Sequence, residues 1–224
     1  MAGRLEGKRV ILTDPGYYSG PGIVKVFKEE GAELFADDRD LTLPGAAEDL
    51  VASVGHVDIL IANHARPFAF TPAQEGTDEE MERLMSSIFY PMHRMIKAVL
   101  PQMLARKNGK IVVTSSVNAI KGRAGGATLY SAARGAQIAY MRYLAHEVAP
   151  HINVNATAQT YVDNPTYFSE EYKKTEDFRL RMAAVPAGRL ASMEEFAKTA
   201  LFLAGPESDF FYGQVIPFAG GWAV

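Results

Sequence analysis

Tyr130 and Arg134 are the residues in this sequence best suited to acid–base chemistry. The alanine-rich segment from Thr128 to about Val148 has a helical pattern, so residues four apart share one helix face. A phenol with a pKa of about 10 is a poor base near neutrality, and each unit of lowering takes about 1.4 kcal/mol of phenolate stabilisation. A nearby guanidinium, charged at any relevant pH, can supply one or more such units in a low-dielectric crevice. We therefore expect Tyr130 to be a general base whose pKa Arg134 lowers.

Short apolar segments alternate with helical patterns along the chain, and this alternation predicts how the two residues are positioned. We expect buried strands at residues 9–13, 32–36, 57–62, 110–114, 152–156 and 214–218, and helices from about 20 to 31, near 44–54, and at 78–106, 128–148 and 193–204. Residues 160–188 form a long irregular segment. This pattern predicts an α/β fold of a single domain over residues 1–224, with a doubly wound, Rossmann-like parallel sheet flanked by helices.

The loops that follow the strands should converge on one crevice, because sites in such sheets lie beyond the carboxyl ends of the strands. The loops in question follow Thr13, Ala62, Thr114 and Ala156. Ser116, just after the strand 110–114, is therefore expected to meet the helix that carries Tyr130. A serine hydroxyl there could hold a substrate oxygen while the tyrosine removes its proton.

The composition excludes several other classes of function. A net charge of −3 gives no electrostatic footprint for nucleic acid, and the chain has no cysteine for disulfides or thiolate chemistry. The five histidines are scattered without metal-ligand spacing, so we expect no metal. The N-terminus lacks the apolar core of a signal peptide, and no apolar stretch is long enough to span a bilayer. These features favour a cytoplasmic protein.

The loop after the first strand carries a resemblance to the short-chain dehydrogenase/reductase superfamily, which extends over essentially the whole chain. That superfamily places Thr-Gly-x-x-x-Gly-x-Gly between strand and helix, and its helix-ending glycine follows eighteen residues after the threonine and eleven after the last motif glycine. Gly31 has both separations if Thr13 is the threonine and Gly20 the last glycine. Asp14 and Tyr18 then stand at the first two glycine positions. Gly16, Gly20 and Gly22 also have the spacing Gly-x-x-x-Gly-x-Gly. If Gly22 were the last motif glycine, the separation from Gly31 would be only nine residues, and the alignment with the superfamily would need compensating gaps.

The two substituted positions should prevent the loop from holding a dinucleotide. Phosphates approach such a loop because it lacks side chains and because amide hydrogens point outward from a helix N-terminus. The ring of Tyr18 would fill that space, and the carboxylate of Asp14 would repel the pyrophosphate. The segment Ala62-Asn63-His64-Ala65 also departs from the superfamily's Asn-Asn-Ala-Gly. We expect no cofactor; a dehydrogenase whose rearranged loop still binds one is the alternative.

The reacting residues resemble those of one branch of the superfamily. The usual motif of the superfamily as a whole is Tyr-x-x-x-Lys, where this chain has Tyr-x-x-x-Arg. The serine of the superfamily stands thirteen residues before the tyrosine. Ser116 stands fourteen residues before Tyr130 and Ser115 fifteen, so Ser116 is the better match. The serine, Tyr-x-x-x-Arg and a bulky residue in the glycine loop together resemble the halohydrin dehalogenases, which are cofactor-free relatives of the short-chain dehydrogenases.

This resemblance implies a halide pocket. In that family an aromatic ring at the position of Tyr18 fills the nicotinamide region and helps to wall the halide. The remaining halide-binding positions match a segment after the fifth strand (Gln159, Thr160, Tyr161, Val162). Among the aromatic residues in loops, Phe68 and Tyr167 are candidates for the substrate pocket, whereas Trp222 could pack in the core or at a subunit contact. The chain departs from the family at Gln159, where some members have proline. The arginine's possible aspartate partner is also missing, because Asn63 and His64 stand near that position.

The expected reaction converts a vicinal haloalcohol to an epoxide, with release of halide and a proton. Ser116 and Tyr130 bind the hydroxyl, Tyr130 removes its proton, and the alkoxide expels the halide from the neighbouring carbon. In reverse, the resemblance implies that small anions open epoxides, and it also implies a homotetramer. Two alternatives stay open: an NAD(P)-dependent reductase with a remodelled loop, and a non-enzymatic relative that binds small molecules or a partner.

Overall fold

Six parallel strands form the central sheet of the computed structural model, which describes residues 3–123 and 125–223. The strands are β1 (Arg9–Thr13), β2 (Glu33–Asp37), β3 (Ile59–Asn63), β4 (Gly109–Ser116), β5 (Ile152–Gln159) and β6 (Val215–Phe218). Their order across the sheet is β2-β1-β3-β4-β5-β6. The strands read as nearly continuous apolar runs because both faces of the sheet are covered by helices.

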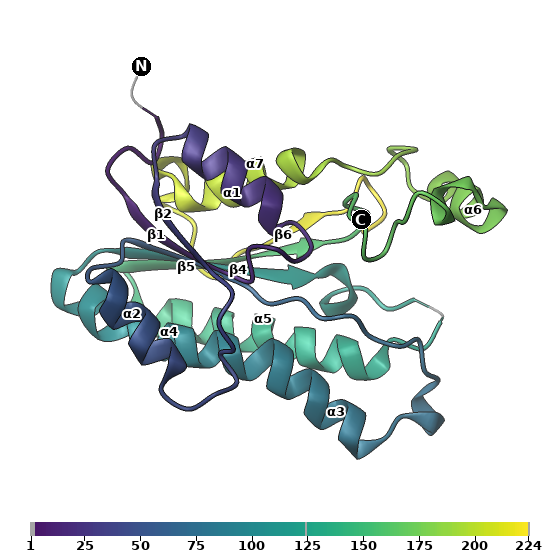
Figure 1. The fold of residues 1–224 in the computed structure, drawn as a ribbon, viewed down its shortest axis with the longest axis horizontal. Helices are drawn as coiled ribbons and strands as arrows, with labels where there is room; N and C mark the ends of the chain where they lie inside the picture. The colour runs from purple at the N-terminus through teal and green to yellow at the C-terminus, as the bar shows by residue number, and fades with distance from the viewer. Residues whose placement is uncertain (1–2, 124, 224) are drawn as a thin grey trace.

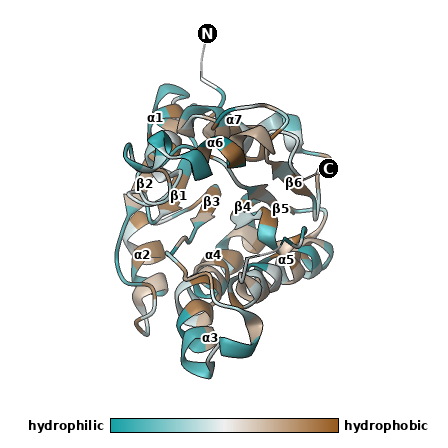
Figure 2. Ribbon diagram, turned by 90° about the vertical axis from the view of Figure 1, so that its right-hand side faces the viewer, coloured by the Kyte–Doolittle hydropathy of each residue, from teal (hydrophilic) through white to brown (hydrophobic). Residues whose placement is uncertain are grey.

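The helices form one layer on each side of the sheet, as Figures 1 and 2 show. On one side lie α1 (Gly20–Glu29) and α7 (Met193–Ala204), and on the other lie α2 (Ala46–Val54), α4 (Tyr90–Arg106) and α5 (Thr128–Val148). Two shorter helices are α3 (Asp78–Leu84), which leads into α4, and α6 (Glu176–Ala183), which lies beyond the end of the sheet (Figure 1). Each layer buries its own apolar cluster against the sheet, with Phe27 and Phe196 on one side and Met95 and Met103 on the other. The predicted doubly wound α/β fold is confirmed.

Several boundaries differ from the prediction. Strands β4 and β5 each run past their predicted ends, to Ser116 and Gln159, because they pair in register over their whole length. The predicted helix 78–106 is interrupted by a π-helical turn at Met85–Phe89. The irregular segment contains the helix α6, whose N-terminus is capped by the side chain of Thr175.

The register of β4 and β5 determines which loops meet. Ser116 at the end of β4 pairs with Gln159 at the end of β5, so the segment that follows Gln159 begins beside Ser116. Helix α5 packs along both strands and along the 3₁₀ turn Val117–Ala119 that follows Ser116. Sheet pairing and helix packing together therefore bring the predicted catalytic residues to one end of the sheet. Within the described ranges, no helix is long and apolar enough to cross a membrane.

Candidate active site

A cavity of about 270 Å³ opens beyond the carboxyl ends of β4 and β5. Its lining includes Ser116 and Tyr130 together with aromatic rings from three separate segments, which follow β1, β3 and β5. Predicted site residues among the lining are Tyr18, Phe68, Thr160, Tyr161 and Tyr167. This cavity lies where the parallel-sheet topology places ligand sites.

The phenol and the guanidinium are in direct contact. Tyr130 and Arg134 lie one turn apart on α5, and Arg134 Nε donates a hydrogen bond of 2.9 Å to the Tyr130 oxygen. Arg134 is 3% exposed and Tyr130 6% exposed. The buried guanidinium is therefore positioned to stabilise negative charge that develops on this oxygen during a reaction.

Arg134 is held in place by neutral partners. Its Nη1 donates to the Thr114 carbonyl at 3.1 Å and to Gln137 Oε1 at 3.0 Å. The Gln137 amide donates in turn to the Ile88 carbonyl in the π-helical turn. Among the described residues no carboxylate forms an ion pair with Arg134, and its hydrogen bonds other than the one to Tyr130 go to neutral acceptors.

The two candidate serines have different surroundings. Ser115 is buried, and its hydroxyl donates to the backbone carbonyl of Arg134 at 3.3 Å. Ser116 lines the cavity, and its Oγ accepts a hydrogen bond of 3.2 Å from the amide of Asn118. This contact orients the Ser116 oxygen but leaves its hydroxyl hydrogen free. Within the described chain no hydrogen bond links Ser116 directly to Tyr130, and both residues line the same cavity.

The backbone at the two substituted glycine positions keeps a glycine-like conformation. Asp14 has φ 48° and Tyr18 has φ 58°, in the left-handed region that glycine adopts most easily. Gly20 remains a glycine because a Cβ there would lie 2.4 Å from the Pro15 carbonyl oxygen. The conformation therefore matches the register deduced from the sequence, with side chains added to the first two positions.

The Tyr18 ring lies among the aromatic residues of the cavity. It packs edge-on against Tyr167, with the ring centroids 5.5 Å apart. Burial raises the pKa of the Tyr18 phenol above its ordinary range, and burial likewise raises the pKa of Tyr167 to about 12. Both phenols are therefore neutral near pH 7, unlike a group suited to act as a base.

Phe68 covers the reacting phenol. Its ring stacks on Tyr130 with 3.9 Å between centroids and 9° between planes, and it approaches Tyr167 at 6.4 Å. Such a cover excludes water from one face of Tyr130 and strengthens the effect of the Arg134 charge. Both predicted substrate-pocket residues are thus in the cavity.

A buried ionic cluster lies behind Tyr18, and it was not predicted from the sequence. Arg66 donates to both carboxylate oxygens of Asp14, at 2.7 and 3.2 Å, and His64 Nδ1 lies 3.4 Å from the same carboxylate. Burial opposes ionisation of Asp14, but the hydrogen bonds from His64 and Arg66 outweigh it and hold the pKa of the carboxyl below its usual value. Burial also lowers the pKa of His64, despite the nearby carboxylate.

This cluster does not fit the dinucleotide that the loop would hold if its glycines were present. A pyrophosphate at this loop would meet the Asp14 carboxylate, and the Tyr18 ring would occupy the adjoining space. Arg66 cannot compensate, because it is already paired with Asp14. Asn63, which donates to the carbonyls of Asp14 and Tyr17, further fixes the loop in this closed form.

The four residues predicted to bind halide are divided between two environments. Thr160 and Tyr161 line the cavity. Gln159 is buried, with its side chain accepting a hydrogen bond of 3.0 Å from Ser19, and Val162 is fully buried in an apolar cluster. Tyr161 has φ 55° and packs edge-on against Trp222, which is partly buried against the same apolar cluster. The side chains of Gln159 and Val162 do not line the cavity.

The backbone of this segment offers donors instead. The amide of Thr160 donates to the Phe218 carbonyl, whereas in the described residues the amides of Tyr161 and Val162 have no hydrogen-bond acceptor. Consecutive free amides next to a left-handed residue are typical of anion-binding concavities. Of these two residues, Tyr161 lines the cavity and Val162 does not.

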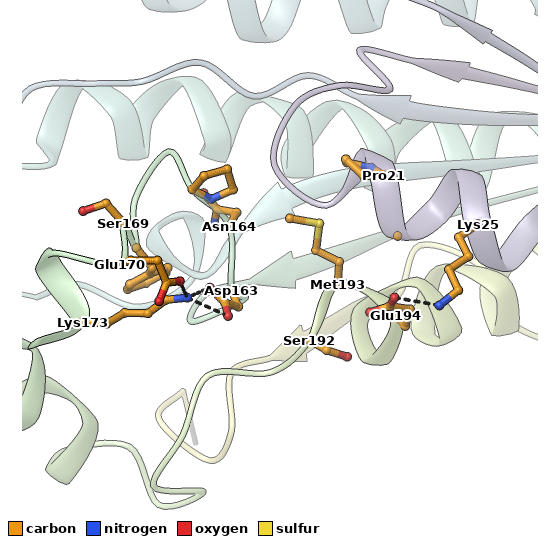
Figure 3. A pocket seen from close by; sticks show the side chains of 13 residues that line it. Pro21, Lys25, Asp163, Asn164, Ser169, Glu170, Lys173, Ser192, Met193 and Glu194 are labelled. Carbon is orange, nitrogen blue, oxygen red and sulfur yellow. Dashed lines mark hydrogen bonds and ion pairs between the residues drawn. The ribbon is translucent and has the colours of Figure 1, made fainter.

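A second hollow, of about 590 Å³, lies between the N-termini of α1 and α7 and the segment after β5 (Figure 3). Its two lysines are already paired, Lys25 with Glu194, and Lys173 with Asp163 and Glu170. It contains none of the predicted site residues. In residues 3–123 and 125–223 no group of three histidine or acidic side chains could hold a metal ion. The cavity at Tyr130 is thus the candidate active site.

Comparison with known proteins identifies the family. The family model described as enoyl-(acyl carrier protein) reductase matches residues 6–223. The 3-oxoacyl-(acyl-carrier-protein) reductase FabG of Thermotoga maritima is 28% identical, over 99% of this chain and 100% of its own. A solved structure described as a dehalogenation enzyme is also 28% identical, with a TM-score of 0.89 and both chains covered completely. A gluconate 5-dehydrogenase from Burkholderia cenocepacia, solved with NADP and tartrate, is 24% identical to this chain and has a TM-score of 0.87. The match covers 98% of this chain and 96% of that protein, and at this identity it shows the fold alone. The chain belongs to the short-chain dehydrogenase/reductase superfamily.

Proposed function

We propose that the protein is a cofactor-independent halohydrin dehalogenase, a carbon–halide lyase that converts vicinal haloalcohols to epoxides. The observation that carries the proposal is the 2.9 Å hydrogen bond from Arg134 to the Tyr130 oxygen, in a cavity walled by Tyr18 at a cofactor-loop glycine position. It is supported by the full-length similarity to a structure described as a dehalogenation enzyme.

The reaction needs only groups that the chain supplies. Tyr130, as the phenolate beside Arg134, accepts the proton of the substrate hydroxyl, while Ser116 donates a hydrogen bond to the substrate oxygen. The oxygen then forms a bond to the neighbouring carbon, the carbon–halogen bond breaks, and halide leaves with the electron pair. Because the nucleophile is within the substrate, its effective concentration is high and no covalent enzyme intermediate is required.

The departing halide needs compensation for its charge. The free amide hydrogens of Tyr161 and Val162 can donate to it, and the positive ring edges of the surrounding aromatic side chains add to this. Preorganised backbone donors of this kind act without rearrangement during the reaction. The roles of the Gln159 and Val162 side chains are then to support this backbone, Gln159 through its bond to Ser19.

A second candidate function is NAD(P)-dependent reduction, favoured by the full-length similarity to FabG. It would require the Tyr18 ring and the paired side chains of Asp14 and Arg66 to move out of the space that the cofactor phosphates occupy. The two functions differ in one simple respect. The lyase releases halide in the absence of any nicotinamide cofactor, and the reductase releases none.

The proposed function is tested by halide release from 1,3-dichloro-2-propanol and its dibromo analogue, with no cofactor added. Tyr130→Phe removes only the reacting oxygen, and we expect the rate to fall about 10²–10⁴-fold, as for loss of a general base. Tyr143→Phe, on the same helix but 83% exposed, is the matched control and should keep full activity. The proposal fails if the native protein releases no halide, or if Tyr130→Phe is as active as the control.

A further inference from the structure

The wall of the active-site cavity carries positive charge that dehalogenation alone does not explain. Two arginines line it, Arg123 in the loop between β4 and α5 and Arg181 on α6. The reacting groups Ser116 and Tyr130 and the halide-binding amides account for every charge that changes during ring closure. A neutral haloalcohol therefore gives these arginines nothing to bind.

Both guanidinium groups are held against aromatic rings of the same cavity. The Arg123 guanidinium lies 4.9 Å from the centroid of Phe70, and that of Arg181 lies 5.8 Å from the centroid of Tyr172. Stacking of this kind fixes a guanidinium by its face and leaves its N–H edge open to other partners. Both arginines are exposed to solvent, so the rings orient the two cations at the open side of the cavity.

The local charge is not balanced by acidic groups. Arg181 Nε is 3.0 Å from Asp177, which also accepts a hydrogen bond from the Tyr172 hydroxyl. In the part of the chain that the structure describes, Arg123 has no acidic partner. The residues that line the cavity thus include two arginines and no acidic residue.

The size of the cavity limits the length of the substrate that it can hold. A volume of about 270 Å³ corresponds to a sphere roughly 8 Å across, which admits a short chain and no large substituent. A substrate whose hydroxyl lies at Tyr130 could place a second polar group at the arginines if two or three carbons separate the two. A planar carboxylate is the group that the forked donors of arginine fit best.

We propose that the natural substrate is a short haloalcohol that carries a carboxylate, bound by Arg123 and Arg181 while its hydroxyl lies at Ser116 and Tyr130. This inference rests on the proposed function, because it names the substrate class of that site. The product would be the corresponding epoxy acid.

The experiment compares two substrates that differ in charge and hardly in size. These are 4-chloro-3-hydroxybutanoate and 4-chloro-3-hydroxybutanamide, with chloride release as the measurement. We expect kcat/KM to be about tenfold or more higher for the acid, through KM, since a charge-assisted pair is lost in the amide. In Arg123→Met and in Arg181→Met this preference should fall severalfold, and in the double variant it should approach one.

A matched control variant is Arg179→Met. This residue lies on α6 like Arg181, pairs with Glu176, and does not line the cavity. It should leave the preference for the acid unchanged, which separates a local effect from a general loss of positive charge. Added salt should reduce the preference of the native protein and have no such effect on the double variant.

A binding measurement keeps this inference separate from the proposed function. Calorimetric titration with 3-hydroxybutanoate and 3-hydroxybutanamide, which carry no halogen, should show tighter binding of the acid in the native protein alone. If no halide is released but this difference appears, the dehalogenase proposal fails and the carboxylate site stands. If both substrates are turned over equally well, or if both arginine variants keep the preference, the carboxylate site is refuted.

Discussion

The pair formed by Asp14 and Arg66 allows a quantitative test of how the cofactor loop is closed. Asp14 is 5% exposed and accepts two hydrogen bonds from Arg66, whose side chain is 30% exposed. Replacing Arg66 by Met leaves a buried carboxylate whose remaining side-chain partner is His64. Breaking a fully buried pair costs about 3–5 kcal/mol, and partial access of water to this site reduces our expectation to about 2 kcal/mol.

For a domain of this size, about 2 kcal/mol corresponds to a fall in Tm of roughly 4–8 °C, measurable by thermal melting followed by circular dichroism. The control is Arg83→Met, which breaks the more exposed pair with Glu80 and should cost under about 1 kcal/mol. Adding Asp14→Asn to Arg66→Met should restore part of the lost stability, since asparagine tolerates the left-handed conformation and carries no charge. If Arg66→Met melts like the native protein, or if the second substitution lowers Tm further, the interpretation of a buried, charge-balanced closure is wrong.

Three further results are expected. Gly20→Ala should destabilise the protein by more than about 1 kcal/mol in urea unfolding, because its Cβ would lie 2.4 Å from the Pro15 carbonyl oxygen, and an unchanged midpoint would refute this. Arg134→Lys should reduce dehalogenation about tenfold or more, since an ammonium cannot reproduce the forked contacts to Tyr130, Thr114 and Gln137; equal activity would show that charge alone suffices. The free energy of unfolding should fall as pH drops below about 6.5, because the unfolded chain binds the proton that buried His64 excludes, and the lowered pKa of Asp14 adds a further loss below about pH 4. Urea titrations between about pH 7.5 and pH 3 test this, and a flat profile would contradict it.

The fold could be predicted from the sequence because its signals are local. Apolar runs bounded by turn residues predicted all six strands, and α5 and α7 begin at their predicted residues, α7 through a capping box of Ser192 and Glu195. The ends of β4 and β5 were placed too early because Ser116 and Gln159 are polar, yet cross-strand pairing extends both strands to these residues. The π-helical turn at Met85–Phe89 could not be predicted, because the helical spacing of apolar residues does not change there.

The site could be predicted only in part. The spacing of Tyr130 and Arg134 determined their contact, because one helix carries both. The closure of the loop by Arg66 could not be predicted, since 52 residues separate it from Asp14 and no local pattern links them. The two arginines of the cavity wall were missed for the same reason: Arg123 lies in a loop and Arg181 on α6, and only the tertiary fold brings both to one cavity.

The claim that supports all the others is that the loop after β1 is closed to a dinucleotide by Tyr18 and Asp14. Titration of the protein with NADPH and NADH, followed by the fluorescence of the reduced nicotinamide, measures this directly. We expect no saturable change at cofactor concentrations up to the millimolar range, in the same preparation that releases halide. Saturable binding with a Kd in the micromolar range, lost on addition of the oxidised cofactor, would contradict the claim and favour a reductase.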